Sequence, residues 1–137
     1  MPLTHLNPST MHRNPAFSQG VVIEPGSRLV VVGGQNGVDA TGNVVGSGLR
    51  EQTAQALRNV LTVLAEVGAS QADVAKLTIH LVDGSDVEEG FEASREVWGD
   101  HPTAVTVLLV ARLGRPEFLV EIEALAVVPA APVAQAG

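Results

Sequence analysis

The chain has 137 residues, of which 45% are hydrophobic, and a formal net charge of −7 with no run of Lys or Arg. This length fits one domain, and the acidic balance argues against binding to nucleic acid or to an anionic membrane surface. The absence of Cys excludes disulfides, thiolate nucleophiles and Cys-ligated zinc. No apolar stretch approaches the roughly 20 residues of a membrane span, and no secretory signal opens the chain. We therefore expect a cytoplasmic protein.

The N-terminal third predicts an extended arm and two strands. Residues 1–16 are rich in Pro and Asn and lack periodicity, so we interpret them as an arm. Residues 17–23 and 29–35 are apolar and β-branched, which predicts strands. Pro25 and Gly26 stand between them in the order that a type II turn prefers. The two strands are therefore predicted to form a hairpin.

Two amphipathic helices are predicted further along the chain. Apolar residues at helical spacing indicate a helix over residues 49–67, with Ser47 as the N-cap and Gly68 after its end. A second helix is predicted over residues 87–98, opened by Asp86 in a capping box with Glu89 and ended by Gly99.

Three further strands complete the expected domain, over residues 74–82, 104–110 and 119–128. The order ββ-α-β-α-ββ predicts one α+β domain over residues 1–137, with a mixed sheet and both helices on one face. The tail, residues 129–137, is small and polar and is expected to be flexible. The uncovered sheet face is rich in Val and Leu, which points to a partner, most simply a second copy of the chain.

The last strand contains two glutamates in an otherwise apolar run, LVEIEALAVV. Carboxylates are rarely buried unless they are paired or hydrogen-bonded. Glu121 and Glu123 share one face of this strand, since they lie two residues apart. Either they face water or this strand lines a polar cleft or an interface.

Six stretches in order give the chain a resemblance to a known family. The stretches are NPAFSQGVV, VVVGGQ, LAEVGAS, VAKLTIHLVD, HPTAVTV and VEIEALAV. Together they resemble the Rid/YjgF family of reactive-intermediate deaminases, from about Asn14 to Val128. The resemblance implies a chorismate-mutase-like fold and a homotrimer with a central barrel and clefts between subunits. It also implies hydrolysis of imines or enamines without a cofactor.

The resemblance carries over to the site unevenly. The family's water-positioning glutamate is retained as Glu121, whereas its carboxylate-binding arginine is replaced by Ala104. Phe17 stands where the family has a tyrosine, and Gly33 stands where it has a serine. An asparagine of the family's second helix is replaced by Phe91. We expect Glu121 to act on water in a cleft whose substrate-binding residues are Phe17, Gly33, Gly34, Gln35, Phe91, His101, Thr103, Ala104 and Val105.

No other cation is an obvious substitute for the missing arginine. Arg112 shares strand parity with Ala104 but lies eight residues on, roughly 26 Å along an extended strand. Arg115 lies in a loop, and His101 is closer, while an arginine of a neighbouring subunit stays open as an alternative. The four histidines have no ligand spacing among them, so no metal site is expected.

Three functional hypotheses follow from these residues. The first is a Rid-type hydrolase of an imine, enamine or related carbonyl compound, for which loss of the arginine favours a substrate without a carboxylate. The second is a trimeric protein that binds a small apolar metabolite without chemistry, as a sensor or scaffold. The third, a ribonuclease, ranks below both because the chain is acidic and lacks a paired acid and base.

Overall fold

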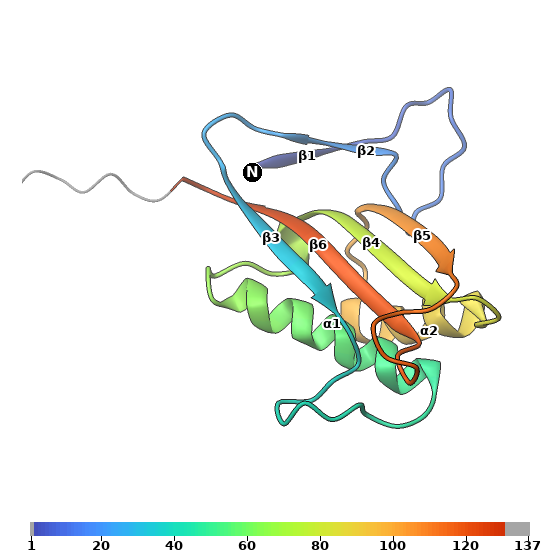
Figure 1. The fold of residues 1–137 in the computed structure, drawn as a ribbon. Helices are drawn as coiled ribbons and strands as arrows, with labels where there is room; N and C mark the ends of the chain where they lie inside the picture. The colour runs from blue at the N-terminus through green and yellow to red at the C-terminus, as the bar shows by residue number, and fades with distance from the viewer. Residues whose placement is uncertain (1, 131–137) are drawn as a thin grey trace, which may run out of the picture.

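The computed structural model describes residues 2–130 as two layers, a mixed sheet with two helices on one face (Figure 1). The sheet order is β3-β6-β4-β5, in which β4 and β5 are parallel and the other neighbours are antiparallel. The predicted α+β class, with both helices on one face, is confirmed. The elements are β1 (Leu3–Leu6), β2 (Gly20–Ile23), β3 (Arg28–Gln35), α1 (Leu49–Ala65), a 3-10 turn (Gln71–Asp73), β4 (Val74–Val82), α2 (Val87–Trp98), β5 (Ala104–Val110) and β6 (Val120–Val128).

Both predicted helices form, although their ends differ in detail. Asp86 caps α2 as predicted, because its side chain accepts hydrogen bonds from the backbone N–H groups of Glu88 and Glu89. The predicted N-cap of α1 is wrong: Gly48 occupies that position and no side chain caps the helix. The regular helix also ends at Ala65, before the predicted end at residue 67.

The predicted hairpin between the first two strands is wrong. Gly26 has the positive φ of 80° that the predicted turn requires, but β2 does not pair with β3. It pairs instead with β1, which lies inside the predicted arm. Leu3 of β1 packs against Ala75 and Val127 and so covers one end of the main sheet. The predicted tail lies mostly outside the described residues.

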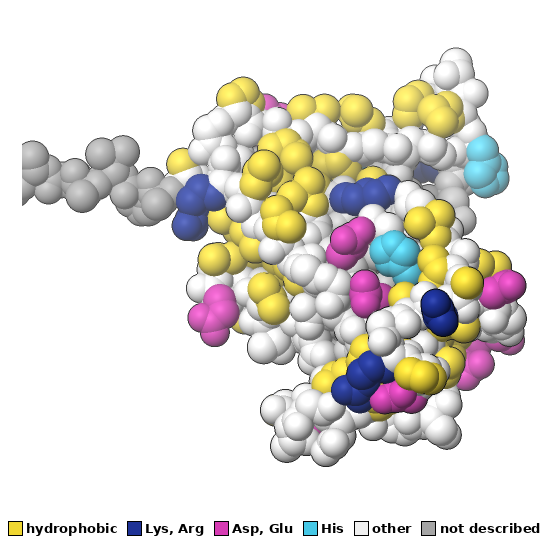
Figure 2. Space-filling model, in the orientation of Figure 1, with side chains coloured by type: hydrophobic (Ala, Val, Ile, Leu, Met, Phe, Trp, Pro, Cys, Tyr) yellow, Lys and Arg dark blue, Asp and Glu magenta, His cyan; other side chains and the backbone are white. Residues whose placement is uncertain are grey.

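The sheet face opposite the helices, called the outer face below, is largely uncovered. Alternation along β3 turns Val30 and Val32 toward the helices, where Val32 is buried in the core. Leu29 and Val31 point the other way and are 59% and 77% exposed. Figure 2 shows apolar side chains gathered on this face beside a band of charged side chains and a histidine. The expected exposed apolar surface is therefore present.

Gly37 lies where the segment after β3 crosses α1. A Cβ atom at this position would lie 2.5 Å from Cα of Gln52, which is far inside van der Waals contact. Gln52 cannot withdraw, because its buried amide donates to the carbonyl of Glu117 at 3.0 Å and accepts from the N–H of Leu119 at 2.9 Å. These two bonds anchor the loop before β6 on α1.

A Gly37→Ala substitution is therefore expected to lower the free energy of unfolding by about 1–3 kcal/mol, as overpacking does. Gly33→Ala is the matched control, because nothing lies within 4 Å of a Cβ at that position and its φ is not positive. Urea denaturation of both variants measures the difference. Equal stability of the two variants would contradict this account of the crossing.

Candidate functional site

Glu121 of β6 is held in place on the outer face. Its carboxylate oxygen Oε1 accepts a hydrogen bond from Nδ2 of Asn36 at 3.2 Å, and the same amide donates to the carbonyl of Val120 at 3.0 Å. On its other side the carboxylate lies against Gly34, where a Cβ atom would come within 2.6 Å of Oε2. Only a residue without a side chain fits here, and the group that approaches its backbone is the candidate catalytic carboxylate.

The backbone of β3 is irregular at Gly34, next to its contact with Glu121. The pairing of β3 with β6 shifts between Val32 and Gln35, so the two glycines form a bulge. Bulges re-aim side chains and are frequent beside active sites. Gly33, which the sequence resemblance puts at the family's serine position, has open space where a side chain would be.

Helix α1 supports the segment that carries Asn36. Nδ2 of Asn59 donates to the carbonyls of Asn36 and Val38 at 3.1 and 2.9 Å, and its own Oδ1 accepts from Gln55. The orientation of Glu121 therefore depends on an amide chain that begins on the buried side of the sheet. Sequence reasoning treated Gln55 and Asn59 only as the polar face of a helix.

A tight turn closes the segment that follows. The carboxylate of Asp39 accepts hydrogen bonds from the hydroxyl and N–H of Thr41 and from the N–H of Asn43. The Thr41 hydroxyl, followed by the backbone donors, holds the pKa of Asp39 below its ordinary value. The turn stays fully formed above the ordinary carboxyl pKa and loses these bonds as pH falls through the lowered value.

A small polar pocket of about 390 Å³ lies further along the outer face. Parallel pairing of β4 with β5 places Lys76 directly beside Ala104, the residue that the sequence resemblance puts at the family's arginine position. The ammonium of Lys76 donates to the hydroxyl of Thr106. Phe17 reaches the same edge through a bridge to Thr103. The pocket is lined by His12, Asn14, Phe17, Ser18, Gln19, Lys76, Ala104, Val105 and Thr106.

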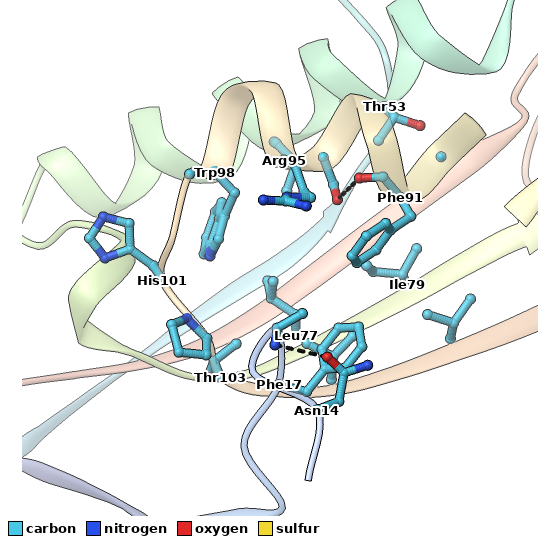
Figure 3. A pocket seen from close by; sticks show the side chains of 18 of the residues that line it. Asn14, Phe17, Thr53, Leu77, Ile79, Phe91, Arg95, Trp98, His101 and Thr103 are labelled. Carbon is cyan, nitrogen blue, oxygen red and sulfur yellow. Dashed lines mark hydrogen bonds between the residues drawn. The ribbon is translucent and has the colours of Figure 1, made fainter. Parts of the chain in front are cut away.

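A second, larger cavity of about 820 Å³ lies on the helix side of the sheet, between α2 and strands β4 and β5 (Figure 3). Phe17 and Phe91 face one another across it, with ring centroids 6.0 Å apart and planes tilted by 58°. Trp98 and Thr103 line its other end, and Thr103 is buried with its hydroxyl bonded to the carbonyl of Val74 at 2.7 Å. This cavity is mostly apolar.

Within one chain the predicted site residues do not form a single cluster. Gly33, Gly34, Gln35 and Glu121 gather where β3 meets β6. Glu121 pairs with His80, four residues along β4 from Lys76, so it lies roughly 13 Å from the small polar pocket. Ala104 lines the small polar pocket only. Phe17 and Val105 line both the small pocket and the larger cavity. The residues that line only the larger cavity are Phe91, His101 and Thr103.

The cations considered from the sequence do not reach Ala104. Arg115 pairs with Glu117 at 2.9 Å, and its guanidinium lies over the ring of Phe118. His101 is exposed at the rim of the larger cavity. Lys76 was missed because the search ran along the chain, whereas the strand pairing brings this residue across from a different strand. A usable signal was present in the sequence: if β4 and β5 are taken as parallel neighbours, alternation puts the side chains of Lys76 and Ala104 on the same face of the sheet.

Two further features bear on the class of site. Among residues 2–130, no group of three or more His, Asp or Glu side chains could hold a metal ion. Across the same residues, no helix is long and apolar enough to cross a membrane. The groups that the structure does bring together are a held carboxylate, a lysine in a polar pocket, and an apolar cavity.

The chain is thus a two-layer α+β domain with a polar pocket on the outer face of the sheet and an apolar cavity beneath α2. The family model described as Endoribonuclease L-PSP matches residues 9–128, and the chain belongs to this family, which is the Rid/YjgF family. The resemblance inferred from the sequence is thus confirmed.

Individual relatives agree with this assignment. The chain is 33% identical to a RutC family protein from Pyrococcus abyssi over 111 residues, which cover 80% of this chain and 84% of that protein. It is 30% identical to the human 2-iminobutanoate/2-iminopropanoate deaminase over 112 residues, 81% of this chain and 79% of that protein. A crystal structure of a Rid family protein of unknown function from Yersinia pestis superposes with a TM-score of 0.83 at 33% identity, covering 93% of this chain and 100% of that one.

Proposed function

We propose that the chain is a Rid-type hydrolase that acts on an imine, an enamine or a related carbonyl compound without a cofactor. In the imine reaction, water oxygen bonds to the C=N carbon, the C–N bond breaks, and a carbonyl compound and ammonia are released. Glu121 moves the two water protons to nitrogen, the first as the C–O bond forms the carbinolamine and the second from its hydroxyl as the C–N bond breaks. The observation that carries the proposal is the preorganised carboxylate of Glu121, fixed by Asn36 and Gly34. The deaminase named among the relatives supports it.

The proposal includes a homotrimer whose outer faces turn inward as a central barrel. Glu121 and the pocket beside Ala104 lie roughly 13 Å apart along β4 of one chain. In a cleft between two subunits, Glu121 of one copy lies opposite the polar pocket of the next copy. The separation within one chain then does not matter, because the two halves of the site come from different copies. The exposed Leu29 and Val31 support this assembly, since apolar surface of this kind favours association.

The second candidate is a trimeric binding protein without catalysis. It is favoured by one specific observation, the apolar cavity that Phe17 and Phe91 face, where the family pattern has polar groups. Ribonuclease activity gains little support beyond the family's descriptive name. The net charge of −7 and the lack of a basic patch in the sequence disfavour RNA as a substrate.

The deciding experiment is imine hydrolysis in solution. An amino-acid oxidase generates 2-iminopropionate from alanine, semicarbazide traps the remaining imine, and the protein is compared with its Ala104→Arg variant. We expect weak wild-type activity and a clear increase in the variant, because the arginine adds a bidentate fork for the carboxylate.

Each other outcome has a definite meaning. Full activity in the wild type would show that the arginine is dispensable and that another group binds the carboxylate. No activity in either protein, nor with enamine substrates, would remove the hydrolase proposal and favour the binding protein.

A further inference from the structure

The larger cavity beneath α2 has the features of a ligand site of its own. We propose that it binds an uncharged, largely apolar molecule with one hydrogen-bond acceptor, such as a carbonyl oxygen. The acceptor bonds to the indole N–H of Trp98. This site goes beyond the proposed hydrolase and does not depend on it, because it involves neither Glu121 nor Lys76.

The sheet separates this cavity from the held carboxylate of Glu121. Side chains alternate along β4, so Leu77 and Ile79 line the cavity, whereas His80, which pairs with Glu121, points to the outer face. Glu121 is not among the residues that line the cavity. A molecule held beneath α2 therefore lies on the other side of the sheet from the proposed catalytic group.

The cavity is open because α2 covers this part of the sheet loosely. Helix α2 packs mainly against α1, and its side toward the sheet carries the small residues Gly90 and Ser94. Val107 of β5 lines the cavity and is 43% exposed, so a ligand can enter along this edge of the sheet. The volume of about 820 Å³ falls in the range of ligand sites.

The wall of the cavity favours an uncharged ligand. Its charged or titratable residues, Glu88, Arg95, Asp100 and His101, are all exposed, so they lie at the rim. The guanidinium of Arg95 already lies 3.8 Å from the carboxylate of Asp100. An ion carried past this rim would lose its water without gaining a partner, which is costly.

Trp98 supplies the polar contact. It lines the cavity and is only 6% exposed, and its Nε1 is buried without a hydrogen-bond partner in the described part of the chain. Buried N–H groups of folded proteins are normally paired. The hydroxyls of Ser94 and Thr103 are already engaged, since each donates at 2.7 Å, to the carbonyls of Phe91 and Val74. The unmet need is therefore an acceptor for the indole.

The indole is a better marker of a ligand than the second unpartnered atom of the wall. Oγ1 of Thr53 is also buried without a partner, but a threonine hydroxyl on a helix can turn to a carbonyl of its own helix. Figure 3 shows the Trp98 ring extending from α2 beside the cavity, with its nitrogen at the end away from the helix. The nitrogen is shielded from water, so a small rotation of the ring brings it to an occupant.

Three matched probes test the ligand class: benzophenone, 1,1-diphenylethene and 4-benzoylbenzoate. The second replaces the carbonyl oxygen by a methylene group of similar shape, and the third adds a charge. Trp98 is the only tryptophan of the chain, so its indole N–H gives one resonance in a ¹H–¹⁵N spectrum. We expect benzophenone alone to move this proton downfield. Calorimetry should show 4-benzoylbenzoate to bind at least about tenfold more weakly than benzophenone.

Variants then locate the site. Trp98→Phe keeps a ring but removes the N–H, so the affinity of benzophenone relative to 1,1-diphenylethene should fall about tenfold, the scale of one hydrogen bond left unmade. Ser94→Leu fills the cavity and should weaken both probes. Thr62→Leu is its matched control, because Thr62 is exposed on α1 and its hydroxyl likewise donates to a carbonyl of its own helix. Melting temperatures verify that each variant is folded.

The proposal would be overturned by an unmoved indole resonance, or by an affinity ratio that Trp98→Phe leaves unchanged. Tighter binding of 4-benzoylbenzoate would also overturn it and would point to Arg95 as the contact. Irradiation of bound benzophenone crosslinks it to neighbouring residues, and a product outside the cavity wall would contradict the location. Binding without imine hydrolysis would retain this site and remove the hydrolase, whereas hydrolysis without binding would do the reverse.

Discussion

A Val31→Asp variant is expected to be a monomer, whereas the wild-type chain should have about three times the monomer mass of 14.2 kDa. Val31 is 77% exposed on the outer face, so the aspartate is solvated in a single chain and leaves the fold intact. In a trimer with inward-facing sheets the same charge would be desolvated without a partner, which strongly disfavours association. Light scattering after size-exclusion chromatography measures the mass.

The matched control is Val63→Asp, on α1 at 38% exposure and away from the outer face. It should keep the wild-type mass. If the clefts between subunits form the site, Val31→Asp should also lose imine hydrolysis although its melting transition persists. A monomeric wild-type protein, or an unchanged mass in Val31→Asp, would contradict the proposed assembly.

Glu121→Gln is expected to lower kcat/KM for imine hydrolysis by roughly 10²–10⁴, the usual contribution of a positioned general base. The amide has the same shape and still offers an oxygen to Asn36, so the melting temperature should change little. Semicarbazide trapping at several substrate concentrations, together with thermal unfolding, separates activity from stability.

Glu123→Gln is the matched control for this prediction. The residue lies two positions further along the same strand and is exposed, and residues 2–130 offer its carboxylate no ion pair. It should retain activity within a small factor. Equal losses in the two variants would point to a general effect of negative charge on the outer face and would remove Glu121 as the base.

Local sequence signals were enough for most of the secondary structure. Strands β4 and β5 and helix α2 have the predicted bounds, and β6 begins one residue later than predicted. Each is defined by information within a few residues: an apolar run, an Asp N-cap, or a glycine with positive φ after the helix. The pairing of β2 with β1 was missed because it depends on distant contacts of Leu3 with Ala75 and Val127.

The candidate site was less accessible to sequence reasoning. Glu121 and Gly34 were both predicted as site residues. Their contact depends on a bulge in β3, which no local sequence pattern predicts. Asn36 and Asn59 were not selected as site residues, since amides in a loop and on a helix carry no chemical signature of their own. Lys76 lies 28 positions from Ala104 in the sequence, and only strand pairing makes them neighbours.

The bridge from Phe17 to Thr103 changes how the N-terminal segment should be regarded. Because Phe17 and Asn14 form part of the wall of both pockets, the segment before β2 helps to shape them. A fusion tag that displaces residues 14–17 while β1 stays paired with β2 would leave the main sheet and helices folded. The circular dichroism spectrum of such a protein would match that of the intact chain, although the walls of its two pockets would be altered. Ligand selectivity measured on it would therefore be misleading, so we expect affinity tags to be safer at the C-terminus.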